Sequence, residues 1–356
     1  MDDLRAQFPV LERLAYLNAG SNGPVPRRAL EAVAESLERQ AEEGRGDKAH
    51  FEQIIGRIDH LRQRIALLVG CQTGELALTG STTDGVNAVL NALDLGPGDE
   101  VLTSDEEHPG VLAPLAALRD RRGVRVRMAP IARLADEVRP ETKLVACSHV
   151  SWRTGAVVDA PPLAATSALV LFDGAQGLGA VPTKVPELGC DFYAASGQKW
   201  LCGPNGIGYL YARAELAREL PAPWPGYGVL ADSAKPFELE LHPDARRFSI
   251  GFPAPHQVEW AIAALDVLEE QGLGAVYARA VELAARLADR LRRPVAPRGD
   301  STLVSWEDPD PERMVERLRA EGLVVRNLPS TPYVRASVGA WNSEAEIDRL
   351  AELAVG

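Results

Sequence analysis

Apolar residues near the start of the chain recur at helical spacing. Between Arg27 and Val69 they fall at steps of three and four, as in Ala29, Val33 and Leu37, which predicts helix. After Gly70 the pattern changes to short apolar runs that alternate with helical stretches at 83–93 and 112–121. The runs are 76–78, 100–103, 124–126, 144–147, 168–172, 192–194 and 207–211. This alternation indicates an α/β fold with a mostly parallel sheet, and the continuous apolar run 168–172 is typical of a strand covered on both faces.

The C-terminal part has a different pattern. Residues 221–236 are rich in Pro and Gly and predict an irregular segment. Helices are expected at 255–271, 276–291 and 311–321, and strands at 301–306, 323–326 and 333–337. Ser343 and Glu346 have the spacing of a capping box and predict the start of a final helix. This tail is expected to form a smaller α+β domain.

Composition and charge exclude several classes of protein. The chain has 356 residues, 46% of them hydrophobic, and a net charge of −12. These values suit a globular protein of about two domains and argue against a nucleic-acid binder, which needs clustered cations. The acidic N-terminus and the lack of a long apolar run predict neither a secretory signal nor a membrane span. Scattered cysteines and histidines predict reduced thiols, a cytoplasmic location and no metal site.

Polar clusters follow several of the expected strands, at the edge where open α/β sheets bind ligands. Ser81, Thr82 and Thr83 stand between the strand 76–78 and a helix. Hydroxyls and free N–H groups at a helix N-terminus can bind phosphate, although such a cluster taken alone is more often only an N-cap formed by Ser81 or Thr82. Asp173 and Lys199 follow the strands 168–172 and 192–194.

Lysine is scarce in this chain, which makes Lys199 notable. Only five of the 38 Lys and Arg residues are lysines. A buried lysine becomes a nucleophile for carbonyl groups, whereas the ordinary alternative is a surface lysine. Asp173 would need a cation beside it, such as a pyridinium nitrogen, or would serve as a cap or ion-pair partner. His108 could stack on a flat ring, or could be a capping or core histidine.

A resemblance makes these clusters specific. Residues 196–206, Ser-Gly-Gln-Lys-Trp-Leu-Cys-Gly-Pro-Asn-Gly, resemble the S-G-H-K-x-x-x-G-P-x-G signature of the class V aminotransferase family of pyridoxal-phosphate (PLP) enzymes. Four more stretches resemble family elements: 173–176 (D-x-A-Q), 107–108 (Glu-His), 81–84 (the phosphate turn) and 333–342 (R-x-S-x-x-x-Y-N). The resemblance implies fold type I, with a large domain at 16–257 and a small domain formed by 1–15 and 258–356. It also implies a homodimer.

The resemblance assigns roles to individual residues. Lys199 would be the Schiff-base lysine and the base for the Cα proton, Asp173 would hold the pyridine nitrogen, and His108 would stack on the cofactor ring. The expected phosphate contacts are Ser81, Thr82, Thr83, Ser196 and Gln198. Gln176 would reach the phenolic oxygen of the cofactor, and Arg335 would bind the carboxylate of a small amino-acid substrate. Asn18 and Trp152 are expected near its side chain.

Several positions depart from the family pattern. Gln198 replaces the signature histidine, and Trp152 stands where an asparagine is common. In 247–252, Phe252 replaces the threonine that reaches the partner subunit's phosphate, although Arg247 or the Gly251 backbone could contribute. Between Gly322 and Arg335 there is no cysteine, so a persulfide-forming cysteine desulfurase is disfavoured.

The first expectation is therefore an amino-acid aminotransferase. A C–S lyase of the cysteine or cystine type and an amino-acid epimerase are the alternatives. A cofactor-binding regulator without catalysis would be expected to carry a basic DNA-binding module, which the sequence does not show. An NAD-dependent oxidoreductase would need G-x-G-x-x-G spacing, and Gly174, Gly177 and Gly179 do not have it.

Overall fold

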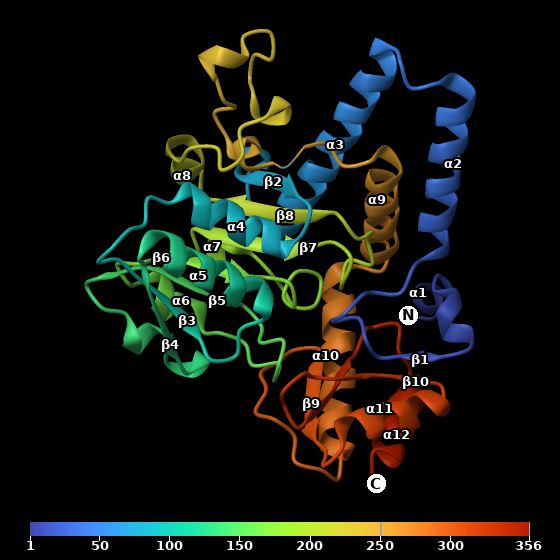
Figure 1. The fold of residues 1–356 in the computed structure, drawn as a ribbon. Helices are drawn as coiled ribbons and strands as arrows, with labels where there is room; N and C mark the ends of the chain where they lie inside the picture. Colours follow the sequence, from blue (N-terminus) through green and yellow to red (C-terminus); the bar gives the residue numbers. More distant parts are fainter. Residues whose placement is uncertain (250, 356) are drawn as a thin grey trace.

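The computed structural model describes residues 1–249 and 251–355, and a seven-stranded sheet forms its centre (Figure 1). The strand order is β2-β8-β7-β6-β5-β3-β4. Only β8 runs antiparallel to its neighbours, so the predicted mostly parallel sheet is confirmed. The strands are β2 (Leu76–Thr79), β3 (Glu100–Ser104), β4 (Arg125–Ala129), β5 (Thr142–Ser148), β6 (Leu169–Asp173), β7 (Phe192–Ser196) and β8 (Gly208–Ala212).

Helices cover both faces of this sheet. Side chains of β6 alternate between two hydrophobic clusters, with Val170 and Phe172 in one and Leu171 in the other. This alternation is what a strand buried on both faces requires. One cluster includes residues of α4 (Thr82–Ala92), α5 (Pro109–Arg122) and α8 (Ala214–Glu219). The other includes residues of α3 (Lys48–Val69), α6 (Ala160–Ala164), α7 (Val185–Leu188) and α9 (Pro255–Glu269).

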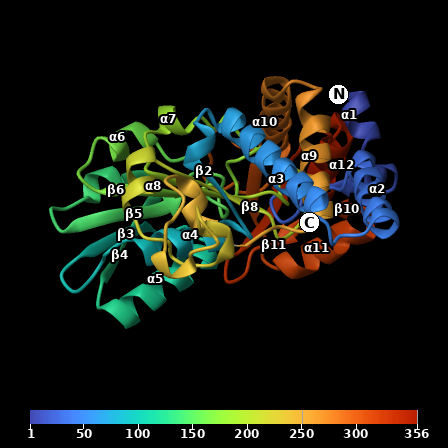
Figure 2. The same ribbon diagram turned by 90° about the horizontal axis from the view of Figure 1, so that it is seen from above.

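The helical periodicity of residues 27–69 belongs to two helices, α2 (Arg27–Glu43) and α3. Gly44 ends α2 with φ of +83°, a conformation that glycine adopts readily. Asp47 then caps α3 by accepting a 2.7 Å hydrogen bond from the backbone N–H of His50. The chain therefore turns between the two helices, and α2 packs against α9 while α3 reaches back to the sheet (Figures 1 and 2).

The C-terminal part forms a smaller α+β unit around a third hydrophobic cluster. Its helices and strands are α10 (Leu273–Arg290), β9 (Leu303–Glu307), α11 (Pro311–Ala320), β10 (Leu323–Val324), β11 (Arg326–Asn327), β12 (Tyr333–Ser337) and α12 (Glu344–Leu353). The capping box of Ser343 and Glu346 is present at the start of α12. The expected strand 323–326 is divided between two sheets: β10 pairs with β1 (Ala15–Tyr16), and β11 pairs with β12.

The N-terminal segment joins this C-terminal unit. Besides the β1–β10 pair, Arg5 of α1 (Asp2–Ala6) forms an ion pair with Glu346 at 2.7 Å, and the ring of Phe8 packs on Trp341. The chain then runs through residues 17–23 toward the edge of the large sheet. Within the described residues, no helix has the length and apolar character that a membrane crossing needs. Ile250 of the 247–252 stretch lies outside the described residues.

Candidate active site

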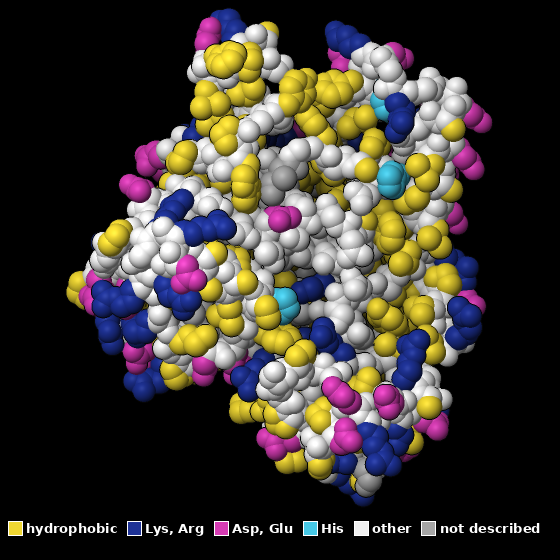
Figure 3. Space-filling view, viewed as in Figure 1, with side chains coloured by type: hydrophobic (Ala, Val, Ile, Leu, Met, Phe, Trp, Pro, Cys, Tyr) yellow, Lys and Arg dark blue, Asp and Glu magenta, His cyan; other side chains and the backbone are white. Residues whose placement is uncertain are grey.

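A pocket of about 310 Å³ lies at the carboxyl ends of β5, β6 and β7, where the sheet meets the C-terminal unit. In Figure 3 a histidine and Lys or Arg side chains meet at the middle of the face shown. Every residue predicted for the site lines this pocket except Asn18. The lining residues are Ser81, Thr82, Thr83, His108, Trp152, Asp173, Gln176, Ser196, Gln198, Lys199 and Arg335, together with Gly20, Ser21, Asn22, Ala175 and Arg326.

Lys199 follows β7, and its backbone packs closely against Gly23 of the N-terminal segment. The backbone N–H of Gly23 donates a 2.8 Å hydrogen bond to the carbonyl of Gln198, and a Cβ atom at Gly23 would lie 2.1 Å from the carbonyl oxygen of Lys199. Burial lowers the pKa of Lys199 to about 8; the charge of Asp173 opposes this shift, and Arg335 and Arg326 add to it. About a tenth of the amine is therefore neutral, and nucleophilic, at pH 7, far more than for an ordinary lysine.

Asp173 ends β6, with only 6% of its surface exposed. Its Oδ1 accepts a 2.8 Å hydrogen bond from the N–H of Ala175. Burial raises the pKa of Asp173, whereas the nearby charge of Lys199 lowers it. A second cation beside this carboxylate would stabilise its charged form, as a protonated pyridine nitrogen does in PLP sites.

Hydroxyl groups gather where α4 begins. Ser81 is the N-cap of α4, because its Oγ accepts a hydrogen bond from the N–H of Asp84 at 3.1 Å. Ser196 Oγ accepts from the N–H of Thr82 at 3.0 Å and lies 2.6 Å from Thr82 Oγ1. Ser81 is therefore an N-cap. Phosphate binding stays a prediction that is compatible with this cap, since the same helix N-terminus lines the pocket and favours an anion.

His108 and Trp152 stand ring to ring at the pocket. Their centroids are 5.1 Å apart and their planes are nearly perpendicular, at 87°. Nδ1 of His108 accepts a 3.0 Å hydrogen bond from the N–H of Gly110, so Nδ1 carries no proton. Partial burial, with the charges of Lys199, Arg326 and Arg335, lowers the pKa of His108 to about 4. The ring is therefore neutral near neutral pH, and its flat face could lie against the ring of a cofactor.

Arg335 is almost completely buried, with 1% of its surface exposed. Nη1 donates a 2.7 Å hydrogen bond to the carbonyl of Trp152, while Nε and Nη2 are buried without a hydrogen-bond partner. Burial and the nearby Arg326 lower the pKa of Arg335 to about 9. An unpaired buried donor edge is costly unless a ligand fills it, and its geometry matches a carboxylate.

Arg326 is the main site residue that sequence reasoning missed. It lines the pocket and pairs in register with Arg335 across β11 and β12. Its Nη1 donates to Ser21 Oγ at 3.1 Å, and Ser21 in turn donates to Asn18 Oδ1 at 2.8 Å. Asn18 therefore stands behind Ser21 rather than in the pocket wall. Only the register of β11 with β12, which the sequence does not display, brings Arg326 to the site.

Gln176 lines the pocket with its amide already engaged. Nε2 donates to the carbonyl of Gly20 at 2.8 Å, and Oε1 accepts from Trp200 Nε1 at 3.0 Å. One N–H of the amide is left for the expected contact with a phenolic oxygen. The absence of a side chain at Gly20 lets Gln176 and Arg335 approach its backbone, because a Cβ atom at Gly20 would lie within 3.0 Å of both side chains.

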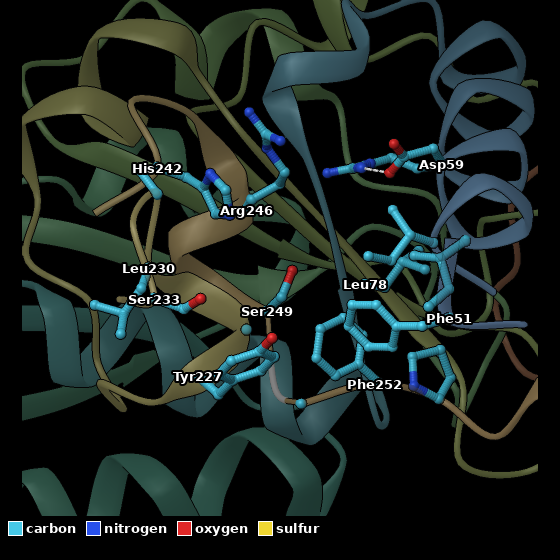
Figure 4. A pocket seen from close by; sticks show the side chains of 17 residues that line it. Phe51, Asp59, Leu78, Tyr227, Leu230, Ser233, His242, Arg246, Ser249 and Phe252 are labelled. Atoms are coloured by element: carbon cyan, nitrogen blue, oxygen red, sulfur yellow. Dashed lines mark hydrogen bonds and ion pairs between the residues drawn. The ribbon is translucent and has the colours of Figure 1, made fainter. Parts of the chain in front are cut away.

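The described residues of the stretch 247–252, which exclude Ile250, do not line this pocket. Arg247 donates to the carbonyls of His242, Arg218 and Leu220 at 2.6–3.1 Å, so its guanidinium supports the local fold, and a contact with the partner subunit's phosphate stays a prediction. Phe252 instead lines a second pocket of about 240 Å³. Figure 4 shows Phe51, Tyr227 and Phe252 together at one side of that pocket and His242, Arg246 and Asp59 at the other.

The first pocket fits PLP. It offers a buried amine, a buried carboxylate, a neutral imidazole ring and a helix N-terminus with hydroxyl groups, all lining one space. Gln198 Oε1 and the Arg335 edge are buried and unpartnered, as expected where a polar ligand supplies the missing partners. In the described part of the chain, no cluster of His, Cys, Asp or Glu could hold a metal ion.

Comparisons with known proteins agree with this fit. The model of the family described as aminotransferase class-V matches residues 15–299. A cysteine desulfurase of Escherichia coli O157:H7 (strain EC4115 / EHEC) is 33% identical over 300 residues, which cover 77% of this chain and 73% of the relative.

Two solved structures of C-DES share the whole fold. A mutant of C-DES with glycine covalently linked to its PLP cofactor has a TM-score of 0.92 and 29% identity, covering 99% of both chains. The complex of the cystine C–S lyase C-DES with its reaction product, cysteine persulfide, has a TM-score of 0.91 at 29% identity, covering 98% of this chain and 99% of that one. From its sequence match, its fold type I architecture and this pocket, the chain belongs to the class V aminotransferase family of PLP-dependent enzymes.

Proposed function

We propose that this enzyme is a C–S lyase that cleaves the Cβ–S bond of cystine or a closely related amino acid. The observation that carries the proposal is a pocket with a buried lysine and two arginines but, among the described residues that line it, no cysteine. A desulfurase needs a thiolate that attacks the substrate sulfur, whereas β-elimination needs only a base and a held substrate. The likeness to the cystine lyase C-DES over nearly the whole chain supports the lyase.

The two arginines favour a substrate with two carboxylates. Arg326 and Arg335 both line the pocket, and cystine carries one carboxylate at each end of its disulfide. Arg335 would hold the carboxylate next to the reacting Cα through its open Nε and Nη2 edge. Arg326 lies next to it across the strand pair, where it would meet the second carboxylate.

Lys199 and Asp173 supply the chemistry of the pocket. Bound PLP would serve as an electron sink for the carbanion formed at the substrate Cα. Lys199 Nζ, neutral in part near pH 8, would take the proton from Cα. The Asp173 carboxylate would keep the ring nitrogen protonated, and the neutral His108 ring would lie against the cofactor ring.

The proposed β-elimination of cystine balances in atoms and electrons without an oxidant. Loss of the Cα proton and cleavage of one Cβ–S bond release cysteine persulfide, which keeps both sulfur atoms of cystine and takes up a proton. The remaining three-carbon fragment takes up water and yields pyruvate and ammonium. Neither half requires a thiol of the protein.

The expected aminotransferase is the competing outcome. Its first step, removal of the Cα proton by Lys199, is the same, and the aminotransferase then returns a proton to the cofactor instead of expelling sulfur. The comparisons support the lyase over the aminotransferase, because the structural neighbour C-DES is named a cystine C–S lyase and the reported sequence relative is named a cysteine desulfurase. Epimerisation would return the proton to the opposite face of Cα.

One experiment separates these outcomes. Holoenzyme is mixed with L-cystine, L-cysteine or a set of other amino acids, and pyruvate, persulfide and the visible spectrum of the cofactor are followed. Pyruvate with persulfide from cystine, lost in Lys199→Ala, is the expected result. Conversion of the cofactor to its pyridoxamine form without pyruvate would indicate a transferase, and D-amino acid would indicate an epimerase; either would reject the lyase.

We also propose a homodimer. Three partly exposed aromatic residues, Phe51, Tyr227 and Phe252, form an aromatic surface at the second pocket, with the ring of Phe252 6.0 Å from each of the other two. Figure 3 shows hydrophobic side chains gathered at the top of the face drawn. Exposed patches of this kind usually mark an interface. Tyr227→Asp is expected to shift the mass in light scattering toward the monomer, whereas the exposed Met128→Asp should not; a wild-type monomer with full cofactor would contradict the proposal.

A further inference from the structure

Two neighbouring glutamates follow β3 and hold the loop that comes after β5. We call Glu106 and Glu107 the acid pair. Glu107 accepts hydrogen bonds from the backbone N–H of Ser148 at 2.8 Å and from Ser148 Oγ at 2.6 Å, and also from Ser104 Oγ. Since Ser148 is the last residue of β5, Glu107 fixes the point where the loop 149–155 leaves the sheet.

Glu106 fixes the middle of the same loop. Its Oε2 accepts from Thr154 Oγ1 at 2.5 Å and from Ser151 Oγ. Ser151 Oγ itself accepts from the N–H groups of Arg153 and Thr154, and Thr154 Oγ1 accepts from the N–H of Ala156, each at 3.1 Å. Both hydroxyls thus receive backbone protons and pass their own protons to one carboxylate, an ordered network in which each bond strengthens the next.

The far side of this loop contacts Arg335, the arginine proposed to bind the substrate carboxylate. The carbonyl of Trp152 accepts the 2.7 Å hydrogen bond from Arg335 Nη1. The carbonyls of Arg153 and Gly155 accept from Ser305 Oγ at 2.6 Å and from Ser301 Oγ at 2.7 Å. The loop is therefore bonded to the large sheet through the acid pair and to the C-terminal unit through three carbonyls.

We propose that Glu106 is a positioning residue for carboxylate recognition: by anchoring residues 151–154, it sets where Trp152 holds Arg335, and hence where the open edge of Arg335 meets the substrate. His108 follows the acid pair directly in the chain, so one short segment places both the ring that faces the pocket and the loop that holds Arg335. The inference rests on the proposed function only in that Arg335 binds the carboxylate of the substrate.

The proposal distinguishes position from charge. In Glu106→Gln the amide oxygen can still accept from both hydroxyls, because it has two lone pairs. In Glu106→Ala no acceptor remains, the two hydroxyl protons lose their partner, and the loop is free to reorganise. A role in positioning therefore predicts that Gln rescues what Ala loses, although both remove the same charge.

The test measures binding rather than turnover. Holoenzyme variants are titrated with glycine and with methylamine, which has an amine but no carboxylate, and the change in visible absorbance of the cofactor gives an affinity for each. The ratio of the two affinities reports carboxylate recognition and does not depend on which reaction follows. Glu187→Ala, at an exposed glutamate of α7, is the matched control.

The expected result is a ratio about tenfold lower in Glu106→Ala than in wild type, as for the weakening of a charged hydrogen bond, with near wild-type ratios in Glu106→Gln and Glu187→Ala. If Glu106→Ala fails to retain the cofactor, Thr154→Val replaces it in the test, because it removes one hydrogen-bond donor to Glu106. The ratio of affinities in Thr154→Val should then fall in the same direction, but by less. An unchanged ratio in the deciding variant, or an equal loss in Glu106→Gln, would overturn the inference. A wild type that does not distinguish glycine from methylamine would instead reject the role proposed for Arg335.

Discussion

Arg326 and Arg335 are direct partners in the antiparallel pair of β11 and β12, and both line the pocket that holds Lys199. Directly opposed residues in such a pair point to the same face of the sheet, which brings two cations to one side of the pocket. Like charges in this position repel unless an anion lies between or beside them. The two guanidinium groups thus offer this side of the pocket a site for a second anionic group beside the carboxylate proposed for Arg335.

This pair gives a prediction on substrate choice. Arg326→Gln should raise KM for cystine about tenfold, because a charge-assisted bond to the second carboxylate is lost. KM for cysteine, which has one carboxylate, should change much less. Steady-state release of pyruvate measures both, and Arg45→Gln, at an exposed arginine between α2 and α3, is the control. Equal effects on cystine and cysteine would show that Arg326 does not contact a second carboxylate.

The lowered pKa of Lys199 predicts how cofactor uptake depends on pH. Burial holds this pKa at about 8, so the neutral amine fraction rises as the pH rises through 8. The rate at which apoprotein captures PLP should increase between pH 7 and pH 8 and level off above pH 9. Stopped-flow absorbance measures it, and Lys199→Ala should retain no cofactor after borohydride. A midpoint near 10.5, the ordinary value for lysine, would contradict the burial of the amine.

The close packing at Gly23 predicts that a larger residue there would displace the backbone around Lys199. A Cβ atom there would lie 2.1 Å from the carbonyl oxygen of Lys199 and 3.0 Å from Cys202 Sγ, so Gly23→Ala must displace backbone. We expect a loss of about 1–3 kcal/mol in the free energy of unfolding, together with faster loss of cofactor on dilution. Gly46→Ala is the control, since a Cβ at Gly46 meets nothing within 4 Å. Equal behaviour of the two variants would show that the contact at Gly23 is tolerated.

Glu107 predicts a pH dependence of stability. Burial raises the pKa of Glu107 to about 7, opposed by the hydrogen bonds from Ser104 and Ser148 and aided by the charge of Asp173. The folded state therefore binds this proton more tightly than the unfolded chain does. The stabilisation is complete below about pH 4, the ordinary range of a glutamate, and is lost as the pH rises through 7.

A neutral side chain at the same position removes this dependence. As the pH rises from 5 to 8, the unfolding free energy of Glu107→Gln should gain on that of wild type, by up to about 3 kcal/mol. Urea denaturation at several pH values measures the difference, and Glu187→Gln should show none. A constant difference between Glu107→Gln and wild type would place the pKa of Glu107 near its ordinary value.

The sequence was most informative about the edge of the large sheet. Asp173 and Lys199 follow the neighbouring strands β6 and β7, whose parallel pairing brings residues after their carboxyl ends together, so apolar runs and the residues after them were enough to predict the centre of the site. Arg326 could not be found in this way. It lies in a two-residue strand whose partner is chosen by packing in the C-terminal unit, and the expected single strand 323–326 gave no sign that it would divide between two sheets.

The place of the N-terminal loop in the pocket wall could not be predicted from the sequence either. Gly20, Ser21 and Asn22 reach the pocket because β1 pairs with β10, a contact between residues more than 300 positions apart. Gln176 is engaged by Gly20 of the same loop. Periodicity describes how a segment faces its own layer, whereas contacts between segments this far apart depend on the completed fold.

The burial of the cysteines has a consequence for the fate of sulfur. Cys147, Cys190 and Cys202 have at most 3% of their surface exposed, and burial raises the pKa of each thiol, as it does for Cys71, so all four remain protonated near neutral pH. No thiolate of the protein is then available to carry sulfur away. In the proposed reaction, the persulfide leaves as a free solute. The acceptor of that sulfur would therefore be a thiol outside this chain, which meets the persulfide after its release from the pocket.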